Sequence, residues 1–196
     1  MNVNRLSLAI AAVVVAGAAA IAAMMITRQD TGRGPEFVPI GGDFTLTSHE
    51  GKRVSDPEFR GKLMLVYFGY TYCPDVCPSE LQVMGSAIDH LGEKADEVTP
   101  IFITVDPQRD DWQALGEYVP HFHDRMVGLT GTPDEIAAAA KAYRVYFAKA
   151  EGEDDESYLM DHTSLVYLMG REGQYLRHFT GGTTAEEMAA AISEEF

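Results

Sequence analysis

Cysteine is nearly absent from this sequence of 196 residues, because only Cys73 and Cys77 occur, in the stretch YTYCPDVCP. A network of disulfides therefore does not hold the fold together. A domain of about 150 residues buries enough apolar surface to fold without covalent help. The two cysteines are left with three interpretations, which are a redox pair, a single structural disulfide and part of a metal site.

Positive charge is also scarce, since 15 Lys and Arg residues face 30 Asp and Glu residues, for a formal net charge of -15. Such a chain repels nucleic acid phosphates, and it attracts basic protein surfaces. We therefore exclude nucleic acid as a partner.

Long uncharged runs are absent except at residues 6–26. As a helix this run would extend about 31 Å, close to the thickness of a hydrocarbon core. The alternative is a cleaved signal peptide, whose apolar region normally covers only about 7 to 15 residues. We predict an uncleaved transmembrane anchor at 6–26, with residues 1–5 as a cytoplasmic stub and the rest of the chain on the other side.

The remainder divides into a tether at 27–40, which contains TGRGP, and a folded domain at 41–196. Apolar runs and turn signals predict an entry hairpin at 43–47 and 52–54 and strands at 63–68, 101–105, 127–130, 164–169 and 175–180. Helices are expected from Pro78 onward, after Asp110-Asp111, and at two capping boxes, 132–135 and 184–187. The helix after the first box is expected to bury Ile136, Ala140, Tyr143 and Phe147.

This order of elements, β-α-β-α-β-α-β-β-α, predicts one mixed α/β sheet with helices on both faces. Paired cysteines after an early strand are typical of a thioredoxin-like fold. The expected architecture is thus a thioredoxin-like domain behind one N-terminal transmembrane helix.

The spacing C-x-x-x-C places Cys73 and Cys77 one turn apart on the same face of a helix, and it also permits a disulfide. At a helix N-terminus the positive dipole end is expected to lower the thiol pKa values, which favours metal binding or thiol exchange. An inert disulfide is disfavoured, because a five-residue loop closed by one contributes little stabilisation.

A third metal ligand is needed to separate metal binding from redox chemistry. Five of the six histidines lie in ordinary turn, helix-end or strand positions. His162 differs, because it directly precedes the strand that in a thioredoxin follows a proline packed against the active-site sulfurs. Two thiolates and one imidazole suit Cu(I), and also Cu(II) with a fourth ligand, whereas zinc prefers a closed set of four.

The motifs GGDFTL, YFGYTYCPDVCPSEL, FITVDPQRD, VGLTG, YRVYF and DHTSLVYLM together resemble the Sco (SenC) copper proteins. These are membrane-anchored proteins that assist assembly of the binuclear copper centre of cytochrome c oxidase. The resemblance implies that Cys73, Cys77 and His162 bind copper. Asp75 and Asp161 also match the family, as support for the ligands or as partner contacts, with strand-end capping as the alternative for Asp161. Asp111 stands where the family usually has Thr, and both residues cap helices well.

Two functions remain open on this basis. The first is a copper chaperone, not an enzyme, that delivers one copper ion to cytochrome c oxidase subunit II and receives it from a copper donor protein. The second is a thiol:disulfide oxidoreductase with Cys73 and Cys77 as its redox-active disulfide. Either protein is expected in a bacterial inner membrane with its domain in the periplasm, or in the equivalent intermembrane space. The acidic run at 151–156 is either a solvated loop or an acidic rim for a partner.

Overall fold

The computed structural model describes residues 39–150 and 158–196. The expected stub and anchor, nearly all of the tether and the acidic run lie outside the described residues. Within the described part of the chain, no helix has the length and apolar character needed to cross a membrane.

The core of the domain is a seven-stranded mixed sheet with the order β2-β1-β5-β4-β3-β8-β9. Its strands are β1 (Thr45–Ser48), β2 (Arg53–Ser55), β3 (Leu63–Gly69), β4 (Val98–Thr104), β5 (Val127–Thr130), β8 (Leu165–Met169) and β9 (Tyr175–Thr180). The strands β3, β4 and β5 are parallel, while β1 and β8 pair with them in the antiparallel sense. All seven residues of β3 are buried, as a continuous apolar run predicts for a central strand.

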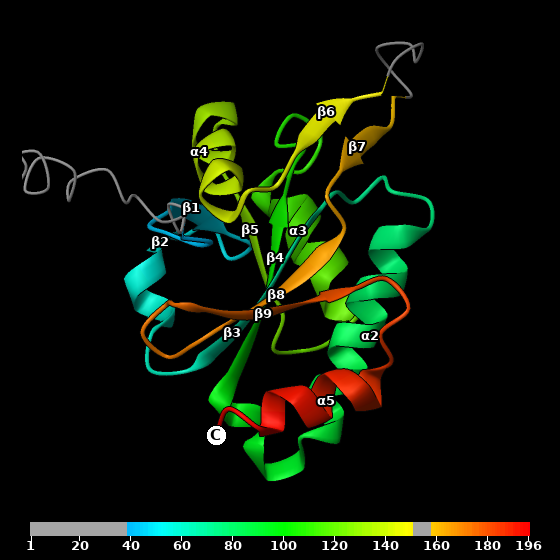
Figure 1. Cartoon of the computed structure of the whole chain (residues 1–196). Helices are drawn as coiled ribbons and strands as arrows, with labels where there is room; N and C mark the ends of the chain where they lie inside the picture. The colour runs from blue at the N-terminus through cyan, green and yellow to red at the C-terminus, as the bar shows by residue number, and fades with distance from the viewer. Residues whose placement is uncertain (1–38, 151–157) are drawn as a thin grey trace, which may run out of the picture. The chain divides into compact units, whose positions relative to one another are not determined.

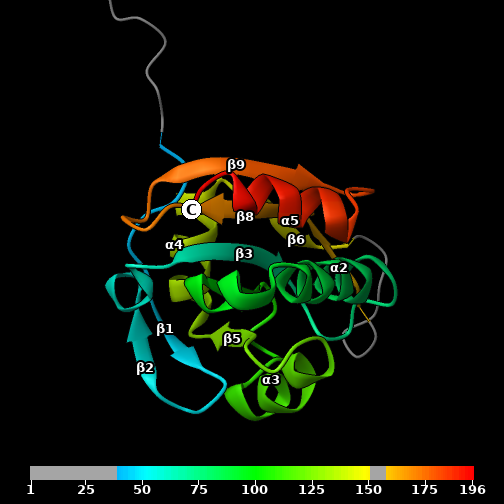
Figure 2. The same ribbon diagram turned by 90° about the horizontal axis from the view of Figure 1, so that it is seen from below.

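In the described part of the chain, four α-helices and three short 3-10 helices surround the sheet. They are α2 (Val76–His90), α3 (Trp112–Tyr118), α4 (Pro133–Tyr143), α5 (Ala185–Ser193), η1 (Asp56–Phe59), η2 (Gly92–Glu97) and η3 (Val119–His121). Figure 2 shows α2 and α5 together on the near side of the sheet and α4 behind it. Tyr143 of α4 accordingly packs against Phe68 of β3, with ring centroids 5.3 Å apart.

The helix starts predicted after Asp110-Asp111 and at the two capping boxes are confirmed, whereas α2 begins at Val76, two residues before Pro78. Both capping boxes form, at Thr132 with Glu135 and at Thr184 with Glu187. Asp111 caps α3 by accepting a hydrogen bond from the backbone N–H of Ala114 at 2.8 Å. The predicted order of strands and helices is therefore confirmed for a thioredoxin-like mixed sheet.

The predicted extent of the helix that begins at Pro133 is wrong, because Phe147 does not belong to it. The strand predicted at 101–105 also begins earlier, at Val98. The helix α4 ends at Tyr143, and Arg144 adopts a left-handed backbone conformation with φ of 58°. Phe147 instead begins β6 (Phe147–Lys149), which pairs with β7 (Met160–His162) in a separate two-stranded ribbon. This ribbon rises beyond the main sheet in Figure 1.

The parallel strands β3 and β4 bring their carboxyl ends to one edge of the sheet, where ligand sites of α/β proteins commonly lie. The loop after β3 contains Cys73, and the loop after β4 contains the DPQRD segment. The β6–β7 ribbon lies at the same edge in Figure 1.

Candidate metal centre

Cys73 and Cys77 meet at the start of α2, but not as the spacing predicts. The expectation that both lie on one helix face is wrong, because α2 begins at Val76 and Cys73 precedes it in the loop. The backbone N–H of Cys77 points at the Cys73 sulfur, 3.4 Å away. The sulfur thus approaches one of the free N–H groups that every helix start exposes.

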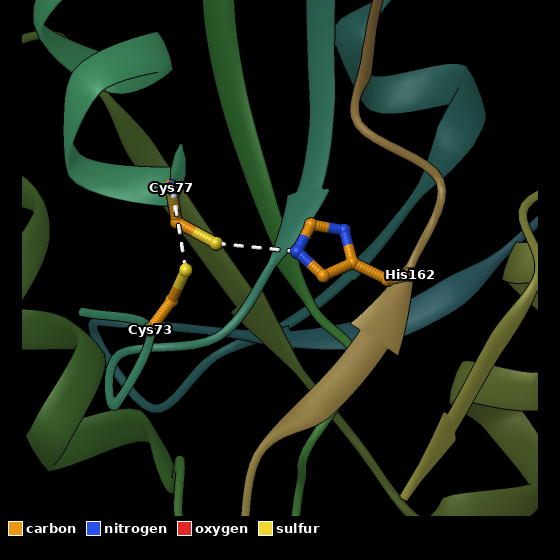
Figure 3. A group of neighbouring side chains, drawn as sticks. All are labelled: Cys73, Cys77 and His162. Atoms are coloured by element: carbon orange, nitrogen blue, oxygen red, sulfur yellow. Dashed lines mark hydrogen bonds between the residues drawn. The ribbon is translucent and has the colours of Figure 1, made fainter. Parts of the chain in front are cut away.

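His162 completes a three-residue group at the end of β7. Its Nε2 atom lies 3.3 Å from Cys77 Sγ, as Figure 3 shows. The donor atoms of Cys73, Cys77 and His162 all lie within 4.8 Å of one another. Two ligands at 2.0–2.3 Å from a common ion stand at most about 4.6 Å apart, so the group needs little movement to hold one.

The imidazole of His162 is oriented for this role. Its Nδ1 lies 3.2 Å from the carbonyl oxygen of Thr163. Because a carbonyl only accepts, Nδ1 carries the proton and the lone pair of Nε2 faces the sulfur. Burial lowers the pKa of His162, which keeps the ring in the neutral form that metals bind.

The Cys77 thiol differs from the expectation of a lowered pKa. Both thiols are free and buried, with Cys77 at 0% and Cys73 at 8% exposure. Burial raises the pKa of the Cys77 thiol, so the predicted lowering is wrong for this residue. Desolvation of the thiolate is the largest cause, and the neighbouring Cys73 thiol raises the pKa further. Because Cys77 must be a thiolate to bind a metal ion, metal binding will release the Cys77 proton to solvent.

Cys73 and His162 line an open pocket of about 360 Å³, whereas the fully buried Cys77 is not among its lining residues. The pocket is lined by Tyr70, Cys73, Pro74, Asp75, Val76, Ala150, Leu159, Met160, Asp161, His162 and Ser164. The structure thus brings all five residues singled out in the sequence to one place. Asp75 and Asp161 are exposed, and His162 takes its Nδ1 partner from Thr163.

Aromatic side chains surround the imidazole, which the sequence did not predict. The rings of Tyr67 and Tyr70 stand edge-on to His162, with centroids 6.1 Å and 5.9 Å away. Tyr70 begins the cysteine stretch, but nothing in the spacing indicates that its ring turns toward a residue so distant in the sequence.

Asp110 is a further residue that the sequence reasoning missed. Its buried carboxylate accepts hydrogen bonds from the backbone and hydroxyl of Thr71, at 2.9 Å and 2.5 Å, and from the Thr104 hydroxyl at 2.6 Å. It therefore ties the cysteine loop to the end of β4. Burial raises the pKa of Asp110, against the opposing effect of these hydrogen bonds. The signal available in the sequence was its place in the run FITVDPQRD, where it was interpreted only as a helix start.

This fold and this group define a class of protein, a thioredoxin-like domain with a Cys-Cys-His metal-binding group. The family model described as SCO1/SenC matches residues 33–196. The chain belongs to the SCO1/SenC family.

Individual relatives agree. The human mitochondrial SCO1 homolog is 42% identical over 156 residues, which cover 79% of this chain and 52% of that protein. The chain spans about half the length of the first curated relatives it matches. The structure of Bradyrhizobium japonicum ScoI with copper bound has 43% identity and a TM-score of 0.75, and covers 80% of this chain and 99% of that one. BsSco, in which a disulfide switch was identified, has 26% identity and a TM-score of 0.66 over 81% of this chain and 94% of its own.

Proposed function

We propose that this protein is a copper chaperone that holds one copper ion through Cys73, Cys77 and His162. The observation that carries the proposal is the approach of the Cys77 sulfur and the His162 Nε2 to 3.3 Å. Two thiolates and one imidazole are soft donors, and three such donors suit Cu(I). A copper-bound relative of 43% identity supports the choice of metal.

The open pocket supports delivery by ligand exchange rather than by turnover. Cys73 is the more exposed thiol and lines the pocket with His162, so a ligand from a partner can approach the ion from that side. Cys77 is fully buried and is the last ligand to be replaced. The exposed Asp75 and Asp161 then contact the partner at the rim, where their charge favours a basic surface.

The proposal includes a membrane anchor at 6–26, a domain facing the periplasm or the intermembrane space, and cytochrome c oxidase subunit II as the recipient. The human SCO1 homolog is mitochondrial, and BsSco belongs to a family of cytochrome c oxidase assembly proteins, which supports an oxidase partner. A separate copper donor protein would load the site.

A second candidate function is the reduction of a partner's disulfide. Two free thiols at the start of one helix favour it, and so does the disulfide switch of BsSco. In such an exchange the Cys73 and Cys77 thiols become a disulfide, the partner's disulfide becomes two thiols, and two electrons and two protons pass to the partner. The imidazole has no necessary part in that chemistry.

Copper titration of the full chain tests the proposal. The reduced protein, titrated with Cu(I) against a competing chelator, is expected to bind one ion per chain. The substitutions Cys73→Ser, Cys77→Ser and His162→Ala should each weaken the affinity for Cu(I) at least tenfold. His178→Ala is the matched control, because His178 lies on β9 and contacts Tyr175 at 2.6 Å rather than the cysteines. Copper affinity unchanged by His162→Ala would refute the proposed ligand set.

A further inference from the structure

The ribbon that carries His162 is separate from the main sheet. Strand β7 pairs only with β6 within the described residues, and the backbone bonds that extend the ribbon stay inside it. They run from the N–H of Ala150 to the carbonyl of Leu159 and from the N–H of Thr163 to the carbonyl of Tyr146, each at 2.9 Å. The position of His162 over the thiols therefore depends on what joins the ribbon to the domain.

The chain itself joins the end of β7 to the main sheet, because β8 begins at Leu165, three residues after His162. A second join lies on the other side of the ribbon at Tyr158, two residues before β7. Tyr158 is 7% exposed, and its hydroxyl donates to Asp106 Oδ1 at 2.9 Å. Its carbonyl accepts a hydrogen bond from Arg109 Nη1, also at 2.9 Å. Asp106 and Arg109 belong to the loop after β4, so both ends of this residue are fixed to the main sheet.

Arg109 also contacts the segment that carries the cysteines. Its guanidinium carbon lies 3.6 Å from the ring centroid of Tyr158 and 4.7 Å from that of Tyr72, next to Cys73. The Arg109 Nε donates to Asp106 Oδ2 at 2.5 Å, and the Asp106 side chain is only 4% exposed. This part-buried ion pair thus contacts the two segments whose ligands must meet.

We propose that Asp106, Arg109 and Tyr158 form a clamp that holds His162 against Cys73 and Cys77 before a metal ion arrives. None of the three is a ligand, and each acts through the position of the ribbon. Arginine suits this place because its planar group stacks on rings while its fork of N–H groups donates in two directions, which lysine does not do. The inference rests on the proposed function, since it requires His162 to bind the copper.

The clamp has a measurable consequence, because a ligand that is already in place loses less conformational freedom on binding. Groups that orient metal ligands typically contribute 10- to 100-fold in affinity. Arg109→Met removes the charge and the hydrogen-bond donors but keeps an unbranched chain. It should weaken the affinity for copper by about 10- to 100-fold. Tyr158→Phe, which loses only the hydroxyl bond to Asp106, should give a smaller loss.

The test is a double-mutant cycle on the full chain with Cu(I) affinity as the readout. Arg109→Met and Tyr158→Phe are each measured alone and combined with His162→Ala. Arg177→Met is the matched control, because Arg177 lies on the edge strand β9 and pairs with Glu194 and Glu195 rather than with the ribbon or the cysteine loop. The EPR spectrum of the Cu(II) form provides a second readout, since the loss of a nitrogen ligand changes it while a general loss of stability does not.

The clamp predicts that Arg109→Met and Tyr158→Phe weaken Cu(I) and alter the EPR spectrum, and that neither weakens Cu(I) further once His162 is Ala. Wild-type affinity in both variants, or the same additional loss in the His162→Ala background, would overturn it. If Arg109→Met does not fold, Tyr158→Phe decides alone by the same criteria. If His162→Ala has no effect on Cu(I) affinity, the proposed function fails and the clamp fails with it. If His162→Ala weakens Cu(I) binding but Arg109→Met and Tyr158→Phe do not, only the clamp is refuted.

Discussion

Gly69, the last residue of β3, lies directly behind the Cys77 sulfur. A Cβ atom built at position 69 would stand 2.9 Å from Cys77 Sγ and 3.0 Å from ring atoms of Phe102 and Tyr67. These are side chains of a packed core, where overpacking costs about 1–3 kcal/mol. The absence of a side chain at position 69 is therefore what lets the sulfur sit in reach of His162.

Gly69→Ala is expected to destabilise the domain by about 1–3 kcal/mol and to weaken copper by roughly tenfold or more, because the sulfur is pushed from its place. Gly170→Ala is the control, since the three atoms nearest to its Cβ would all belong to the flexible amide end of Gln174. Urea unfolding and Cu(I) competition measure both effects. Unchanged copper affinity in a folded Gly69→Ala protein would show that the sulfur position is not critical.

The buried Asp110 predicts a pH dependence of stability. Because burial raises its pKa above the ordinary value of 3.8, the folded state binds this proton more tightly than the unfolded state. The stability from this proton is fully present below pH 3.8 and is lost as the pH rises through the folded pKa. The advantage of wild type over Asp110→Asn in unfolding free energy should therefore shrink from below pH 3.8 toward neutrality.

Denaturant unfolding of both proteins over that range measures the difference. A difference that stays constant, or that grows as the pH rises, would contradict the raised pKa of Asp110.

Arg144 offers a stability prediction away from the copper site. It ends α4 with φ of 58°, a conformation that costs a residue with a side chain about 1–2 kcal/mol and costs glycine almost nothing. Arg144→Gly should thus raise the unfolding free energy by roughly 0.5–1 kcal/mol, after the extra entropy of glycine in the unfolded chain. Lys141→Gly, one turn earlier inside the helix, should lower it by about 1 kcal/mol. Equal losses in both variants would contradict this account.

The domain should function without its N-terminal segment. All proposed ligands lie beyond residue 70, and the buried core begins at Phe44. A protein lacking residues 1–28 is expected to remain soluble and to bind one copper ion per chain, measured by metal analysis after gel filtration. Copper binding by the full-length, membrane-inserted protein alone would contradict this.

Much of the fold could be predicted because its signals are local. The strands at 127–130 and 175–180 are confirmed at both ends, and the two capping boxes form as their sequences indicate. The β6–β7 ribbon could not be predicted, because its strands have three residues each and pair across a long gap in the sequence. The end of α4 could not be predicted either, because Arg144 occupies the left-handed position where glycine usually indicates a helix end.

The three proposed ligands were found from residue type and from the family resemblance, but their environment was not. The burial of Cys77 depends on Gly69 and on the rings of Phe102 and Tyr67, which only the folded chain brings together. The direction of the Cys77 pKa shift follows from that burial. The contacts of Arg109 and Asp110 likewise join loops that follow different strands. Such contacts leave no periodic pattern in a single sequence.

The central claim is that His162 acts as a copper ligand in delivery, and assembly of the oxidase copper site in cells tests it most directly. The measurement is cytochrome c oxidase activity in a strain whose only copy of this protein carries His162→Ala, with His178→Ala as the matched control and folding checked separately. We predict that activity is lost with His162→Ala and retained with His178→Ala, while Cys73 and Cys77 still oxidise reversibly. Normal oxidase activity with His162→Ala would contradict the account and favour the thiol reductase.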